Sequence, residues 1–149
     1  MVWSCLVSIL PGMAQTEKLT DYVNPFVGTD GYGNVYPGAQ IPFGGIQISP
    51  DTDSRFYDAA SGYKYNHLTL MGFSLTHLSG TGIPDLGDFL FIPGTGEMKL
   101  EPGTHEDPDQ GYRSRYSHDK EWASPNYYAV ELADYGVKAE MTSGVRSGM

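Results

Sequence analysis

Two neighbouring runs near the end of the chain constrain the fold most. Residues 127–133 are largely apolar and begin with two tyrosines, and residues 137–142 alternate apolar with polar side chains. The turn-forming residues 134–136 separate them. Because alternate side chains of a strand share a face, the second run has one apolar face. The side chains on that face are Val137, Ala139 and Met141. The pattern predicts two antiparallel strands joined as a hairpin.

Shorter strand-like runs occupy the rest of the chain. They are residues 46–49, 63–67, 68–73, 89–92 and 112–116. The continuous apolar run 89–92 is typical of a buried strand, whereas the acidic, Gly- and Pro-rich residues 94–110 indicate a surface excursion. No segment shows sustained helical periodicity with caps, and 19 Gly and 10 Pro suit many short strands. We therefore predict an all-β fold, an antiparallel β-sandwich.

Composition excludes several classes of protein. Eleven Tyr, six Phe and two Trp in 149 residues argue against disorder and for one domain with a core. A net charge of −9 argues against nucleic acid or an anionic membrane surface as a partner. The single cysteine, Cys5, excludes a disulfide within the chain and a cysteine-rich metal site.

The N-terminus resembles the end of a signal peptide. An apolar run precedes Pro11 and Gly12, and small residues allow cleavage after Ala14. A basic region before the run is absent, so the interpretation is a possibly truncated signal peptide at 1–14; the alternative is an N-terminal strand or a disordered leader. The run is too short to span a membrane, and Trp3 and Ser4 disfavour lipidation of Cys5. We expect the domain to cover residues 15–149 and to be incomplete at its C-terminal end.

Small polar side chains are concentrated in residues 72–82, which contain His77, four hydroxyl side chains and three glycines. Glycines let the backbone approach a ligand or a neighbour closely, and the polar groups can bond sugar hydroxyls. The same composition also suits a tight buried strand connection. A second glycine-rich loop, residues 28–34, lacks the spacing and the following helix of a dinucleotide site.

Several runs together resemble the N-terminal domain of glycoside hydrolase family 92, the exo-acting α-mannosidases. The runs are residues 23–29, 36–39, 42–44, 49–52, 61–65, 72–82, 128–132 and 142–148. The resemblance covers residue 20 to the end of the chain. Each run is a weak signal, but their order and spacing together are specific.

The resemblance implies a β-sandwich followed by a large (α/α)₆ barrel domain, with the active site between them. It implies a calcium-dependent, inverting exo-α-mannosidase that removes terminal mannose from glycans. The catalytic acid and base come from the barrel domain, so we assign no catalytic residue and no metal ligand to this chain and expect it to be inactive by itself. The implied location is secreted, periplasmic or at a bacterial cell surface.

Seven residues are predicted to contact substrate. Tyr32 and Asn34 lie in the glycine-rich loop, where many relatives carry histidines; the alternative is that they only shape a turn. The run Arg55, Phe56, Tyr57 and Asp58 lies where relatives often carry a tryptophan, and an aromatic face can stack on a pyranose. The alternatives there are a surface ion pair and ordinary core. His77 either bonds sugar, supports the domain interface or is a buried structural histidine.

Two further functions stay open at this point. A carbohydrate-binding module that works without a partner domain would share the sandwich and the aromatic loop. A structural or interaction domain would use the loops only for packing, and fold class does not separate the three. Asp85 and Asp88 could bind calcium, but their spacing matches no EF-hand loop and favours structural roles.

Overall fold

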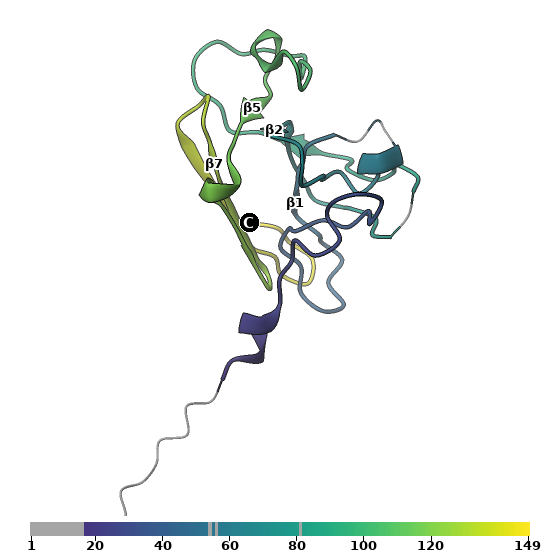
Figure 1. Cartoon of the computed structure of the whole chain (residues 1–149). Helices are drawn as coiled ribbons and strands as arrows, with labels where there is room; N and C mark the ends of the chain where they lie inside the picture. Colours follow the sequence, from purple (N-terminus) through teal and green to yellow (C-terminus); the bar gives the residue numbers. More distant parts are fainter. Residues whose placement is uncertain (1–16, 54, 56, 81) are drawn as a thin grey trace, which may run out of the picture.

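The computed structural model describes residues 17–53, 55, 57–80 and 82–149. The predicted signal peptide at 1–14 therefore lies outside the described residues. Within the described part the helical elements are short 3₁₀ turns of three or four residues, and the strands form antiparallel sheets (Figure 1). The turns are η1 (Leu19–Tyr22), η2 (Tyr57–Ala59), η3 (Pro108–Gln110) and η4 (His118–Lys120). The predicted all-β sandwich class is confirmed.

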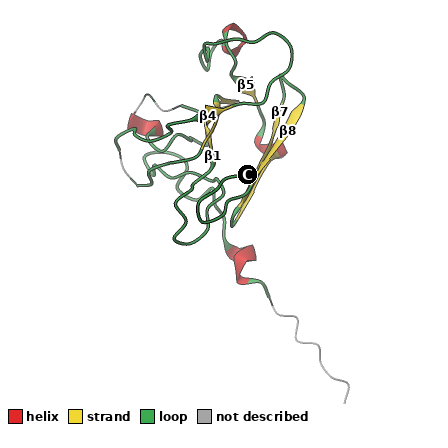
Figure 2. Cartoon of the chain, turned by 180° about the vertical axis from the view of Figure 1, so that it is seen from behind, coloured by secondary structure: helices red, strands yellow, loops and turns green. Residues whose placement is uncertain are grey.

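The described strands lie in three sheets. The first has the order β1-β3-β4, the second β6-β7-β8, and a two-stranded sheet pairs β2 with β5. The bounds are β1 (Ser49–Asp51), β2 (Thr69–Leu70), β3 (Gly72–Ser74), β4 (Leu90–Phe91), β5 (Ser114–Arg115), β6 (Glu121–Ser124), β7 (Tyr127–Leu132) and β8 (Val137–Met141). Seen from behind, most of the remaining chain is loop (Figure 2).

The hairpin predicted from the alternating runs is present. Strand β7 pairs with β8 from Tyr128 opposite Met141 to Leu132 opposite Val137. Exposure alternates along β8, as the pattern predicts. Strand β6 was not predicted, although the turn after it was. Asn126 in that turn has φ 60°, a left-handed conformation that Asn tolerates better than most residues.

The core lies between the first and second sheets. Its buried members come from β2, β3, β7 and β8 and from the residue after β5. They are Leu70, Phe73, Tyr116, Tyr128, Val130, Leu132 and Met141. Burying one such aliphatic or aromatic side chain contributes about 1.5–3 kcal/mol, so this cluster holds the two sheets face to face.

Several strand predictions need correction. Residues 89–92 do not form a buried strand: β4 is the exposed edge of its sheet, because its described ladder is with β3 alone. Residues 63–67 form no strand, because their backbone bonds go to loops, with the N–H of Tyr65 donating to Thr29. Residues 68–73 divide at Met71 between two sheets. In the described part, no helix has the length and apolarity needed to cross a membrane.

Candidate functional site

Three loops that are far apart in the sequence meet on one surface. The N–H of Gly80 donates to the carbonyl of Asn34 at 2.6 Å. The ring centroids of Tyr32 and Tyr57 lie 6.3 Å apart, within the range of aromatic pairs. Gly82 lies against Tyr57, where a Cβ would come within 2.4 Å of ring carbons. The three segments singled out in the sequence thus form one cluster, called the tyrosine loop cluster below.

Both tyrosines of the cluster face solvent. Tyr32 is 79% exposed and Tyr57 is 65% exposed. Stacking on a sugar ring requires an exposed aromatic face, and a tyrosine ring offers an apolar face together with a polar hydroxyl. The arrangement can therefore contact a ligand without any change in the core.

Asn34 shapes the loop that presents Tyr32. Its φ of 47° is left-handed, and its side chain is largely buried, with Nδ2 3.5 Å from the Tyr32 carbonyl. Gly33 packs so closely that a Cβ would lie 2.0 Å from the Gly28 carbonyl oxygen. The loop conformation accordingly depends on these two residue types. Asn34 Oδ1 is buried and has no hydrogen-bond partner among the described residues.

Arg55 lies two residues before Tyr57 and binds a buried carboxylate. Its Nε lies 3.2 Å from Asp53 Oδ1 and its Nη2 lies 3.1 Å from Asp53 Oδ2, a two-pronged contact. The Arg55 side chain is 56% exposed, whereas that of Asp53 is 1% exposed. Burial by itself would raise the pKa of Asp53, but the nearby His105 ring, 3.5 Å away, and the hydrogen bonds from Arg55 outweigh it and hold the pKa well below its usual range.

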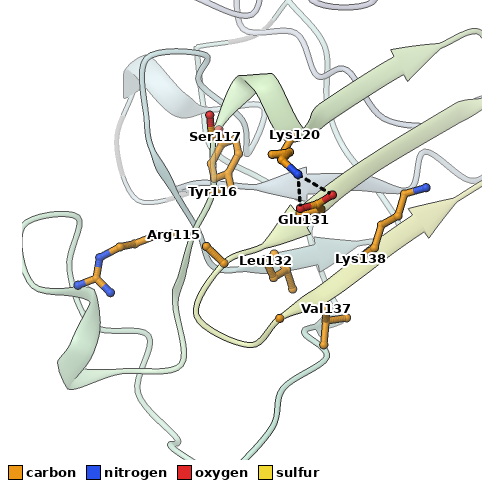
Figure 3. Close-up of a pocket in the computed structure, with 10 residues that line it drawn as sticks. Arg115, Tyr116, Ser117, Lys120, Glu131, Leu132, Val137 and Lys138 are labelled. Carbon is orange, nitrogen blue, oxygen red and sulfur yellow. Dashed lines mark hydrogen bonds and ion pairs between the residues drawn. The ribbon is translucent and has the colours of Figure 1, made fainter.

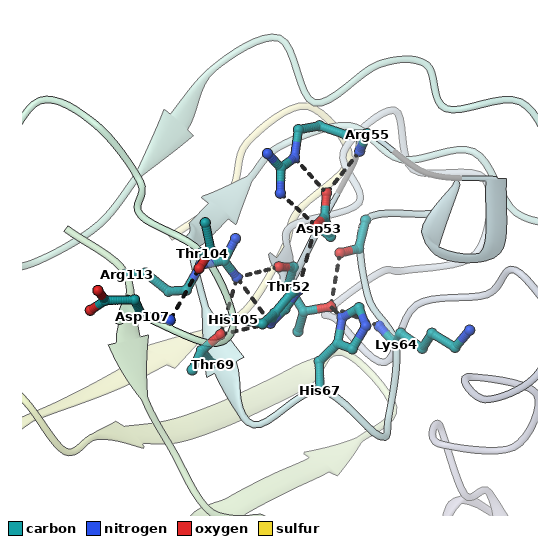
Figure 4. Close-up of polar contacts among 11 residues, drawn as sticks. Thr52, Asp53, Arg55, Lys64, His67, Thr69, Thr104, His105, Asp107 and Arg113 are labelled. Carbon is teal, nitrogen blue, oxygen red and sulfur yellow. Dashed lines mark hydrogen bonds and ion pairs between the residues drawn. The ribbon is translucent and has the colours of Figure 1, made fainter. Parts of the chain in front are cut away.

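A polar network supports this pair from beneath (Figure 4). Arg113, almost fully buried, donates from Nη1 to the Thr52 carbonyl at 2.6 Å and to Thr69 Oγ1 at 3.2 Å. His105 lies 2.8 Å from the same Thr69 hydroxyl and 3.5 Å from Asp53. Burial lowers the pKa of Arg113. The Asp53–Arg55 pair is therefore anchored to the domain interior.

Sequence reasoning missed His105 and Arg113 as parts of this network. His105 lies within the acidic residues 94–110, which were predicted to be a surface excursion, and nothing local marks it as inward-facing. Arg113 belongs to the alternating run 112–116, whose pattern groups it with Arg115 on the polar face, so its burial left no signal in the sequence.

His77 lies in the interior. Its Nδ1 lies 2.7 Å from the Gln47 carbonyl, and its Nε2 lies 2.9 Å from Asp51 Oδ1 and 3.0 Å from Ser74 Oγ. It is 6% exposed and packs beside the ring of Tyr36. Both ring nitrogens are thus used inside the domain, an arrangement that favours the third alternative, a buried structural histidine. Direct contact of His77 with sugar stays a prediction.

The other residues considered in the sequence are either outside the described residues or bonded within their own loops. Phe56 lies outside the described residues. Asp58 belongs to η2, but its side chain is outside the described part as well. Asp85 accepts the N–H of Leu86 at 2.8 Å, and Asp88 accepts the Thr76 hydroxyl at 3.3 Å. Among the described residues no group of three or more His, Cys, Asp or Glu is placed to hold a metal ion.

A separate surface pocket of about 510 Å³ lies beside the β7–β8 hairpin (Figure 3). Tyr116, Leu132 and Val137 give it apolar walls. Lys120 Nζ at its rim lies 3.0 Å from Glu131 Oε2. Of the predicted contact residues, the five whose side chains are described do not line this pocket. It is therefore separate from the tyrosine loop cluster.

Comparisons with known proteins identify glycosidases as relatives of this chain. The sequence pattern of the "Glycosyl hydrolase family 92 N-terminal domain" matches residues 22–149. A curated protein described as an uncharacterized secreted glycosidase, from Arthroderma benhamiae, is 32% identical over 123 residues, which are 81% of this chain and 15% of that protein.

Two solved structures share the fold. The GH92 family glycosyl hydrolase ccman5 is 33% identical with a TM-score of 0.69, over 87% of this chain and 18% of its own. A family GH92 inverting mannosidase from Bacteroides thetaiotaomicron is 24% identical with a TM-score of 0.61, over 89% of this chain and 18% of its own. The chain thus spans less than a fifth of the length of these relatives.

Proposed function

Since this chain belongs to glycosyl hydrolase family 92 and matches the N-terminal domain of that family, we propose that it is part of a secreted, calcium-dependent, inverting exo-α-mannosidase. In this proposal the tyrosine loop cluster forms part of the wall of the sugar pocket. The observation that carries it is the meeting of three separate loops around the exposed rings of Tyr32 and Tyr57, 6.3 Å apart.

Three facts about relatives support the proposal. The family consists of glycosyl hydrolases, one solved relative is named an inverting mannosidase, and the curated relative is described as secreted. Because this chain matches less than a fifth of their length, the activity, the mannoside substrate and the location of the whole protein belong to the proposal.

The proposed role of this domain is binding and orientation. The exposed face of Tyr57 would stack on a pyranose ring, and Tyr32 beside it would extend the aromatic surface. Arg55, held by Asp53, borders the same loop, and a fixed guanidinium can orient hydroxyl groups. Such contacts raise the rate only where they are stronger in the transition state than in the ground state.

The chemical step would be carried out by the rest of a family-length protein. Inversion needs an acid and a base about 6.5–9.5 Å apart, with a water between the base and the sugar. No residue of this chain is assigned either role. Calcium would be held mainly by the remainder of the protein.

The test is kinetic and uses a family-length enzyme that carries this domain. Tyr57→Ala and Tyr32→Ala should each lower kcat/KM for an α-mannoside by roughly 10-fold to 100-fold, which corresponds to about 1.4–2.7 kcal/mol. Tyr22→Ala is a matched control, because Tyr22 is 71% exposed but lies in η1, outside the cluster. Wild-type kcat/KM in both cluster variants would refute the proposal.

The exposed tyrosine pair also fits a carbohydrate-binding module that works without a partner domain. Titration of the 149-residue chain with methyl α-mannoside, followed by NMR of the tyrosine rings, separates the two functions. Saturable binding by the isolated chain favours the module, whereas binding only in the family-length enzyme favours the shared pocket.

A further inference from the structure

Strand β8 has a free edge beside an apolar groove. Among the described strands, β8 is hydrogen-bonded only to β7. Immediately after β8, Thr142 and Met149 exchange two backbone hydrogen bonds of 2.9 Å each, and Ser143 bridges Gly148. Backbone groups alternate between the two edges of an antiparallel strand. The backbone N–H and C=O of Thr142 point away from β7, toward Met149. The backbone groups of Glu140 and Lys138, two and four residues earlier, therefore lie at the same free edge.

The groove next to this edge has a volume of about 470 Å³. It lies between the two larger sheets. Its apolar lining includes Phe73, Leu75 and Phe91 on one side and Val137, Ala139 and Met141 on the other. Gly148 also lines it, and both views place the C-terminal residue between β1 and the β7–β8 hairpin (Figures 1 and 2).

We propose that the free edge of β8 and this groove accept one further antiparallel strand, which continues the ladder that Thr142 and Met149 begin. The strand would be supplied by the remainder of a family-length protein. It would convert the sheet β6-β7-β8 into a four-stranded sheet and cover the groove. This inference concerns assembly of the domain and does not depend on the proposed sugar contacts.

The register fixes the chemistry of this strand. Counting onward from the Thr142–Met149 pair, its first, third and fifth residues face Met141, Ala139 and Val137 across the ladder. Opposed residues share a face of the sheet, so these three positions should be apolar and fill the groove. The second residue faces Glu140 and the fourth faces Lys138. Cross-strand pairs of opposite charge stabilise a sheet, so a cation is favoured at the second position and an anion at the fourth.

A second copy of the chain fits the same edge less well. In a symmetric dimer centred on Ala139, Lys138 of each copy would lie opposite Glu140 of the other copy. That dimer would place the β7–β8 turn of the second copy beside Thr142, where Met149 already lies. An edge strand carrying a lysine is also a common device against self-pairing. A strand that starts from the Thr142–Met149 pair avoids this overlap.

The experiment adds five residues after Met149 and measures amide hydrogen exchange by NMR. The matched extension reads isoleucine, arginine, valine, glutamate and phenylalanine. The control extension has the same residues in the order arginine, isoleucine, glutamate, valine and phenylalanine, so that the charges fall toward the groove. A shift of one residue moves side chains to the opposite face, which makes the control specific for register.

The matched extension should slow exchange of the Lys138 and Glu140 amides at least tenfold relative to the unextended chain, and the control extension should not. The amides of Val137 and Ala139, which face β7, report that the hairpin is folded in every sample. Lys138→Glu should weaken the protection given by the matched extension, and lysine at the fourth added position should restore it.

Two results would overturn the proposal. One is unchanged exchange at Lys138 and Glu140 with the matched extension while the hairpin amides stay protected. The other is protection of these two amides in the unextended chain that grows with protein concentration, because a second copy would then occupy the edge.

Discussion

The guanidinium of Arg55 donates a hydrogen bond to each oxygen of the buried Asp53 carboxylate, with nitrogen–oxygen distances of 3.2 and 3.1 Å. The backbone N–H of Arg55 donates to the same carboxylate at 2.9 Å. These bonds connect the loop that carries the exposed Tyr57 to a buried carboxylate, and their strength depends on the ionisation of Asp53.

Asp53→Asn should destabilise the domain at neutral pH by about 1–3 kcal/mol, the cost of weakening charge-assisted bonds to a buried group. The pKa of Asp53 is held below its usual range in the folded chain. Its contribution is therefore present above the unfolded pKa, near 4, and is lost as the pH falls toward the folded value. Urea unfolding between pH 7 and pH 2.5 should show a steeper loss of stability in the wild type than in the variant.

Asp109→Asn is the control for this prediction. Asp109 also pairs with an arginine, Arg115, at 2.8 Å, but its side chain is exposed, and exposed ion pairs contribute little. Equal pH profiles for Asp53→Asn and the wild type would show that the buried pair does not govern acid stability.

Glu121 is predicted to be a second electrostatic anchor. Its buried carboxylate accepts the hydroxyls of Tyr63 at 3.0 Å and Tyr128 at 2.5 Å, and His118 Nδ1 lies 2.6 Å away. Tyr63→Phe and Tyr128→Phe should each cost about 1 kcal/mol, and Glu121→Gln should cost more because it weakens all three contacts. Chemical denaturation measures each value, and a double variant should be non-additive.

The same cluster predicts alkaline behaviour. Burial, followed by the charge of Glu121, raises the pKa of Tyr128 well above its ordinary value, and burial raises that of Tyr63. A raised folded pKa gives stability that is complete below the unfolded pKa, near 10, and is lost as the pH rises. Ultraviolet titration should therefore show these tyrosines ionising together with unfolding. Gradual ionisation of every tyrosine in the folded chain would contradict the arrangement.

Gly62→Ala should be one of the most damaging single changes. A Cβ at Gly62 would lie 2.2 Å from Asp51 Oδ1 and 3.0 Å from the His77 ring, at a φ of +88°. Gly136→Ala is a matched control, because Gly136 also has a left-handed φ, +62°, but open space around it. The control should cost about 1 kcal/mol for the backbone. Gly62→Ala should cost at least about 2 kcal/mol more, because it disrupts a buried polar pair. Equal melting temperatures would argue against the packing around His77.

Gly82→Ala tests the cluster without touching a tyrosine. The new Cβ would meet the Tyr57 ring at 2.4 Å and displace it, and because that ring is exposed the loss of stability should be small. Sugar binding or kcat/KM should fall in a family-length enzyme. Gly45→Ala is the control, because the atom nearest to its new Cβ lies at 3.6 Å. It should leave sugar binding and kcat/KM unchanged.

The sequence predicted the β7–β8 hairpin because its alternation is strong and local. It also predicted the class of fold, since no segment had helical periodicity. It did not predict β6, which is only four residues long. It also did not predict the exposure of β4, because a short apolar run looks the same in the sequence whether its strand is buried or at an exposed edge of the sheet. Tertiary context determined both.

The sequence singled out three loops as candidates but did not predict that they meet. Tyr32, Tyr57 and Gly82 are brought together by long-range contacts such as the bond from Gly80 to Asn34, and such contacts leave no local signature. His105 was missed for the same reason. For His77 the residue type suggested contact with a ligand, but its burial beside Asp51 depends on the fold.

A crystal structure of a family-length enzyme with an uncleaved α-mannoside tests the central claim most directly. The account predicts a sugar ring packed on the face of Tyr57 at about 4 Å, the distance of ordinary apolar contact, with Tyr32 beside it. A bound mannoside that leaves both tyrosines uncovered would contradict the account, and the tyrosine loop cluster would then have no part in the sugar pocket.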